Sequence, residues 1–144
     1  MSFKRILIAV DNEPVAAHAA DIGMELSREL NAETALVYVI GGTVDYMGDT
    51  GISSEQLVAL AEQEGKQVLS DFSQRLAPKS GALTFLLRGV PGTEIVKAAR
   101  EWPADLIVIG SHGRSGMQRA LLGSVAEAIM RHVPSPGLVV RAKD

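Results

Sequence analysis

Short apolar runs alternate along the chain with longer segments of helical periodicity. The runs are rich in Val, Ile and Leu and do not alternate with polar residues, which is typical of strands covered on both faces of a parallel sheet. We expect strands at Ile6–Val10, Ala35–Ile40, Leu83–Leu87, Leu106–Ile109 and Leu138–Val140.

The segments between these runs repeat apolar residues every three or four positions, as one face of a helix does. We expect helices over Val15–Leu30, Ser53–Leu76, Thr93–Trp102 and Leu122–Val133. Thr93 is expected to cap the third helix, which ends at Trp102 and Pro103. Regular alternation of this kind predicts an α/β fold, with an open five-stranded parallel sheet, helices on both faces and right-handed crossovers.

Length and composition exclude several classes of protein. The chain has 144 residues, which favours a single domain over residues 1–144 because domains average about 150 residues. The absence of cysteine excludes a disulfide framework, a thiolate nucleophile and cysteine-ligated metals. The net charge of −3 gives no basic field for nucleic acid and no polybasic membrane signal. The longest apolar run, Ala35–Ile40, is too short for a bilayer, and no signal peptide is evident, so we expect a cytoplasmic protein.

Candidate binding residues cluster where the predicted strands end. In an open parallel α/β sheet, ligands bind at the carboxyl ends of the strands, where the strand order reverses. The loop after the first strand begins with Asp11, and the loop after the fourth contains glycines before Ser124. These glycines, which allow close approach of the backbone and positive φ angles suited to anion-binding turns, are Gly110, Gly113, Gly116 and Gly123.

The same loop has the chemistry of a phosphate site. Ser124 lies at the start of the fourth predicted helix, where unpaired N–H groups and the helix dipole attract anions. Arg114 and Arg119 add local positive charge. The loop is neither a Walker P-loop nor a dinucleotide fingerprint, because Gly-Lys-Ser/Thr and Gly-x-Gly-x-x-Gly are both absent.

The spacing Gly110-x2-Gly113-x9-Gly123-Ser124 resembles the nucleotide-binding signature of the universal stress protein family. The resemblance covers nearly the whole chain and includes the opening Lys4–Asp11, the stretch Ala104–Gly110 and the closing Pro136–Val140. It implies a Rossmann-like sheet of strand order 3-2-1-4-5, with the switch point between the first and fourth strands.

The resemblance also implies a site for an adenine nucleotide such as ATP. By this likeness Asp11 contacts the nucleotide, with Mg²⁺ a possible companion, and the main chain of Val39 recognises adenine. Gly110 and Gly113 approach the ribose and phosphates, while Gly123 and its two successors hold the phosphate tail. The full set of nucleotide-binding residues is Ala9, Asp11, Val39, Gly110, His112, Gly113, Arg114, Gly123, Ser124 and Val125.

Two positions depart from the family pattern. Asn12 and Glu13 follow Asp11 where the family often has Gly-Ser, and a second carboxylate repels a triphosphate unless magnesium intervenes. Gly137 follows Pro136 where the family usually has Val. In the family this closing strand pairs with its copy across a two-fold axis, so the resemblance implies a homodimer through the C-terminal strand and an unidentified regulatory protein partner.

Several alternatives stay open at the level of the sequence. The glycines could serve turn structure only, and Asp11 could simply cap the first helix. The resemblance favours an adenine-nucleotide-binding regulatory protein without efficient catalysis. The rivals are a slow ATP hydrolase, with Asp11 or His112 positioning water, and a dimeric interaction module that binds no nucleotide. The glycine-rich stretch Gly41–Ile52 is either a lid over the site or a tolerated loop.

Overall fold

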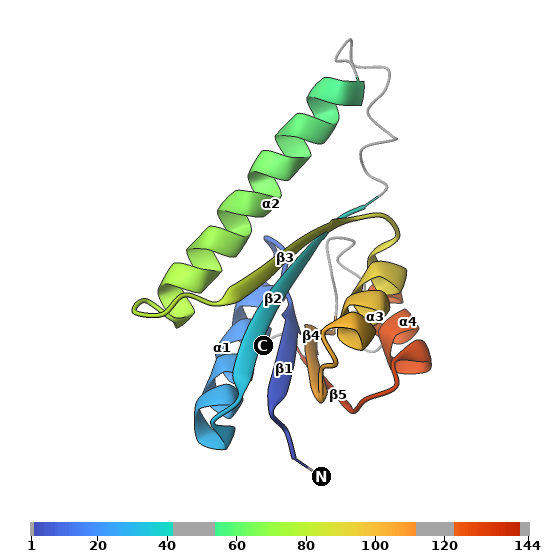
Figure 1. Cartoon of the computed structure of the whole chain (residues 1–144). Helices are drawn as coiled ribbons and strands as arrows, with labels where there is room; N and C mark the ends of the chain where they lie inside the picture. The colour runs from blue at the N-terminus through green and yellow to red at the C-terminus, as the bar shows by residue number, and fades with distance from the viewer. Residues whose placement is uncertain (1, 42–53, 112–122, 142–144) are drawn as a thin grey trace.

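A computed structural model describes residues 2–41, 54–111 and 123–141. Strands and helices alternate along these residues, and the predicted α/β fold is confirmed (Figure 1). The element boundaries differ from the expected ones by at most two residues. The elements are β1 (Arg5–Ala9), α1 (Pro14–Leu30), β2 (Glu33–Ile40), α2 (Ser54–Leu76), β3 (Leu83–Arg88), α3 (Pro91–Glu101), β4 (Leu106–Gly110), α4 (Ser124–His132) and β5 (Gly137–Val140).

The five strands form one parallel sheet of order β3-β2-β1-β4-β5, as the resemblance implied. β1 is central, and its Ile8 is paired with Leu36 of β2 and Val108 of β4. The chain moves outward from β1 to β2 and β3, then returns to the other side of β1 with β4. Because the strand order reverses there, the carboxyl ends of β1 and β4 form a topological switch point.

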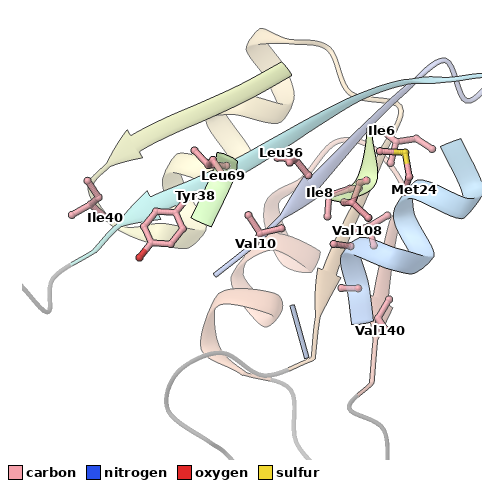
Figure 2. Packing of buried hydrophobic residues seen from close by; sticks show 13 residues of the cluster. Ile6, Ile8, Val10, Met24, Leu36, Tyr38, Ile40, Leu69, Val108 and Val140 are labelled. Atoms are coloured by element: carbon pink, nitrogen blue, oxygen red, sulfur yellow. The ribbon is translucent and has the colours of Figure 1, made fainter. Parts of the chain in front are cut away.

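Each face of the sheet is buried by a different pair of helices. Ile6 and Ile8 pack into a cluster under α1 and α2, part of which Figure 2 shows in close-up. Leu7 and Ala9, the alternate residues of β1, belong to a second cluster under α3 and α4. Figure 1 shows the two pairs of helices on opposite sides of the sheet. Covering both faces explains why β1 reads as a continuous apolar run.

The third helix begins earlier than expected. Its first residue is Pro91, its N-cap is Val90, and Thr93 lies within its first turn, so the prediction that Thr93 caps this helix is wrong. Proline is favoured at the first helical position because it needs no N–H partner there and its φ angle is already helical.

Two sequence predictions fall partly outside the described residues. The glycine-rich stretch Gly41–Ile52 is one, since Gly41 alone of its members is described. The predicted start of the fourth helix at Leu122 is the other, although Ser124 does open α4. Among the helices that the structure describes, none has the length and apolar character needed to cross a membrane.

Candidate functional site

A cavity of about 250 Å³ opens at the carboxyl ends of β1, β2 and β4. Its volume is a little below the roughly 300–1,000 Å³ typical of ligand pockets. Most of its wall is apolar. The lining residues are Ala9, Val10, Asp11, Val15, Ala16, Val37, Tyr38, Val39, Ile40, Gly41, Ala61, Glu64, Pro91, Ile95, Ile109, Gly110, Ser111, Val125 and Ala126.

The cavity brings together half of the residues expected to bind a nucleotide. Its wall includes Ala9, Asp11, Val39, Gly110 and Val125. Gly123 and Ser124 directly precede Val125 at the start of α4 and are not part of the wall itself. The remaining three, His112, Gly113 and Arg114, lie outside the described residues.

The carboxylate of Asp11 shapes the loop that follows β1. Its Oδ1 accepts a hydrogen bond of 2.8 Å from the backbone N–H of Glu13, a turn in which an aspartate bonds the main chain two residues on. Glu13, not Asp11, is the N-cap of α1, and no side chain caps that helix. The alternative in which Asp11 caps the first helix is therefore wrong. The turn keeps the carboxylate at the wall of the cavity.

The start of α4 presents backbone donors beside the cavity. The first hydrogen bond within the helix is donated by Glu127 N–H to the carbonyl of Gly123 at 3.0 Å, and Gly123 N–H itself donates to Ser111 O at 2.6 Å. The N–H groups of Ser124, Val125 and Ala126 thus precede the intrahelical ladder. Together with the positive end of the helix dipole, such N–H groups attract phosphate.

The two described glycines of the predicted signature do not use the conformational freedom that glycine allows. Neither Gly110 nor Gly123 has a positive φ angle, the latter having φ −66°. A side chain at Gly110 would contact Val15 Cγ1 at 3.0 Å. Gly110 therefore lets α1 pack closely on β4. The other two glycines of the loop, Gly113 and Gly116, lie outside the described residues.

Helix α2 contributes a part of the wall that the sequence did not indicate. Ala61 and Glu64 both line the cavity, and Asn12 Nδ2 donates a hydrogen bond of 2.6 Å to Glu64 Oε1. These two residues are separated by 52 positions, and no local motif connects them. The unusual Asn12 after Asp11 was the one available signal. Pro91 and Ile95 of α3, a helix on the other face of the sheet, also line the cavity, and no local motif indicated them either.

The described residues provide no ready-made metal centre. Across residues 2–41, 54–111 and 123–141, no group of three or more His, Cys, Asp or Glu side chains is placed to hold a metal ion. Asp11 and Glu64 are the charged residues of the described cavity wall.

Comparison with known proteins gives a consistent assignment. The family model described as the universal stress protein family matches residues 2–141. Universal stress protein MJ0531 of Methanocaldococcus jannaschii is 35% identical over 96% of this chain and 82% of its own length. The solved structure of hypothetical protein MJ0577 has a TM-score of 0.86 and 26% identity, covering 100% of this chain and 99% of that one.

A further solved structure contains a ligand. It is the universal stress protein from Archaeoglobus fulgidus in complex with dAMP, with a TM-score of 0.63 and 25% identity, covering 97% of this chain and 99% of that one.

Proposed function

The chain belongs to the universal stress protein family, and we propose from this premise that it binds an adenine nucleotide, ATP in particular, in the cavity beside α4. The relative from Archaeoglobus fulgidus was solved with dAMP, which supports an adenine nucleotide as the ligand class. On this proposal the protein is a regulatory module of the stress response, whose state depends on bound nucleotide.

One observation carries the proposal: an apolar cavity at the switch point of the sheet leads to the N-terminus of a helix. A nucleotide needs an apolar slot for its base and a set of N–H donors for its phosphates. The cavity wall at Val39 and Ile95 supplies the first requirement, and the start of α4 supplies the second. Ligands of open α/β sheets bind at such switch points.

Each part of the nucleotide has a partner among the described residues. The base lies against the end of β2, where main-chain groups at Val39 recognise it. The phosphates lie against the first turn of α4, at Ser124 and Val125. Asp11 provides one carboxylate for Mg²⁺, which commonly binds one or two carboxylates together with substrate phosphates. The phosphates of a bound nucleotide would supply the remaining ligands of such an ion.

We propose a regulatory role rather than efficient phosphoryl transfer. Enzymes that transfer phosphoryl groups place cations and a base around the reacting phosphate. The charged residues of the described wall are the carboxylates Asp11 and Glu64, and the expected cation Arg114 lies outside the described residues. The rival, slow ATP hydrolysis, predicts measurable phosphate release by the purified protein and its loss in Asp11→Ala.

The test of nucleotide binding uses the purified protein itself. One sample of freshly purified protein is denatured, and the nucleotide released from it is identified by mass spectrometry. ATP and AMP are titrated by calorimetry into a second, folded sample from which nucleotide has been removed by dialysis. We expect an adenine nucleotide in the extract and saturable binding. An empty extract together with no binding of either nucleotide would favour the module that acts by dimerisation alone.

We also propose a homodimer formed through β5. This strand is at the edge of the sheet, paired only with β4 among the described strands, and it carries Leu138 and Val139. An uncovered apolar edge strand is prone to aggregation unless another strand covers it. Pairing of β5 with its two-fold copy covers this edge.

A further inference from the structure

A hydrogen bond ties the loop after β1 to helix α2 at the mouth of the cavity. Asn12 Nδ2 donates to Glu64 Oε1 at 2.6 Å. Glu64 and Asp11 both belong to the cavity wall, Glu64 on its exposed rim. The bond to Asn12 therefore fixes a second carboxylate, from a distant part of the chain, beside the end of β1.

The order of the strands shows which part of a nucleotide Glu64 would meet. This step rests on the proposed function. The base binds at the end of β2 and the phosphates bind at α4, which follows β4. β1 lies between β2 and β4 in the sheet, so the ribose, which joins base and phosphate, crosses the end of β1. Glu64 is held there through Asn12.

The chemistry of a carboxylate suits the hydroxyl groups of ribose. A carboxylate accepts hydrogen bonds at about four positions and donates none when ionised. It therefore accommodates a ribose hydroxyl in addition to the Asn12 amide. A phosphate at the 2′ or 3′ position would instead meet negative charge. In dinucleotide-binding folds an acidic residue beside the ribose 2′-hydroxyl has the same selective effect.

We propose that Glu64, positioned by Asn12, accepts a hydrogen bond from a ribose hydroxyl of the bound nucleotide and selects against nucleotides phosphorylated at the 2′ or 3′ position. Glu64 is thus a specificity-determining residue. Because it lies at the exposed rim, solvent and salt screen part of the repulsion. The selectivity should accordingly weaken as ionic strength rises.

The test compares 5′-AMP with adenosine 2′,5′-bisphosphate and adenosine 3′,5′-bisphosphate. Dissociation constants are measured by calorimetry at low salt for the wild-type protein, Glu64→Gln and Glu62→Gln. Glutamine keeps an acceptor oxygen for Asn12 while removing the charge, so Glu64→Gln preserves the bond to the loop. Glu62 is exposed on the same helix and is not part of the cavity wall, which makes Glu62→Gln the control for a lost charge.

We expect the wild type and Glu62→Gln to bind 5′-AMP about tenfold more tightly than at least one bisphosphate, a difference of about 1.4 kcal/mol. Glu64→Gln should lose most of this preference. Equal affinity of the wild type for all three ligands would overturn the proposal, as would an unchanged preference in Glu64→Gln. In both cases nucleotide binding itself would stand. Failure of the wild type to bind 5′-AMP and ATP would overturn the proposed function as well.

Discussion

Gly65 of α2 lies against the ring of Tyr38 on β2, so that a methyl group at Gly65 would come within 2.9 Å of Tyr38 Cδ1. Tyr38 is buried in the cluster under α1 and α2 (Figure 2). It also lines the cavity. The missing side chain allows α2 to approach β2 closely. This approach brings Ala61 and Glu64 of the same helix to the cavity wall.

Replacing Gly65 with alanine sets two effects against each other. Alanine favours a helix over glycine by about 1 kcal/mol, whereas overpacking a buried contact costs roughly 1–3 kcal/mol. The added methyl would lie 2.6 Å from Leu86 Cδ1 as well as against the Tyr38 ring. Leu86 can rotate away, but the buried ring has little room to move. Overpacking should therefore prevail, and Gly65→Ala should lower the free energy of unfolding by about 1 kcal/mol.

Urea unfolding measures this difference, and Ser70→Ala is the matched control. Ser70 is exposed on the same helix, so its replacement should change stability by no more than about 0.5 kcal/mol. A Gly65→Ala protein more stable than the wild type would contradict the close packing of α2 on Tyr38. Weaker nucleotide binding in Gly65→Ala would further connect this packing to the cavity.

Gly123→Val tests the phosphate end of the site. Gly123 is the N-cap of α4, with an extended backbone of φ −66° and ψ 157° that valine can adopt. The fold should therefore survive, while a branched side chain would stand beside the N–H groups that we propose as phosphate ligands. We expect the affinity for ATP to fall about tenfold, or about 1.4 kcal/mol. Calorimetry measures the affinity for ATP, with Thr93→Val, a substitution at an exposed position of α3, as the control. Wild-type affinity in Gly123→Val would show that the phosphates do not bind at the start of α4.

The strand pattern predicted the sheet because burial on both faces leaves a direct mark on the sequence. Runs such as Ile6–Val10 can be identified in the sequence without knowing which strands pair with them. The candidate site could be predicted only where local signals mark it, such as Asp11 after a strand and Ser124 at the start of a helix, and its role stays a proposal. Ala61 and Glu64 could not be found this way, because the folded sheet alone brings α2 to the end of β1.

The packing role of Gly110 could not be predicted for a similar reason. A glycine at the end of a strand is typical of both close approach of a ligand and close packing of elements, and the sequence does not distinguish the two. Its neighbour Val15 is distant in the chain and contacts it only because α1 packs on β4. The start of α3 was ambiguous in the sequence as well, because Pro91 and Thr93 are both suitable residues for the start of a helix.

Gly137 offers a test of packing at the last strand. The sequence suggested a lost side chain there, but the Met130 side chain of α4 occupies the place where a Cβ atom would be. Gly137→Val should therefore destabilise the protein by about 1–3 kcal/mol. The double variant Gly137→Val/Met130→Ala should recover part of this loss, giving a coupling of about 0.5 kcal/mol or more. Chemical unfolding of the wild type, Gly137→Val, Met130→Ala and the double variant at one protein concentration measures this coupling. Strictly additive changes in the free energy of unfolding would contradict the contact.

The backbone of β5 shows which groups a second copy could use. Ile107 N–H donates to Pro136 O at 3.1 Å, and Ser111 N–H donates to Val140 O at 2.7 Å. Pro136, which directly precedes β5, and Val140 within it therefore direct their backbone carbonyls toward β4, and Leu138 lies midway between them with the same orientation. Val139 lies at the intervening position, so its N–H and C=O point toward the open edge of the sheet.

Val139→Pro should consequently weaken dimerisation while preserving the fold. Proline has no N–H to donate across the two-fold axis, yet it is tolerated in edge strands where that N–H faces outward. We expect the dissociation constant of the dimer to rise about tenfold or more, which corresponds to about 1.4 kcal/mol. Val139→Ala, which keeps the N–H, is the control and should remain largely dimeric because the backbone bonds persist. Sedimentation equilibrium at micromolar concentrations measures the dimer fraction of each protein. A monomeric wild type would show that β5 does not form an interface, and so would a Val139→Pro protein as dimeric as Val139→Ala.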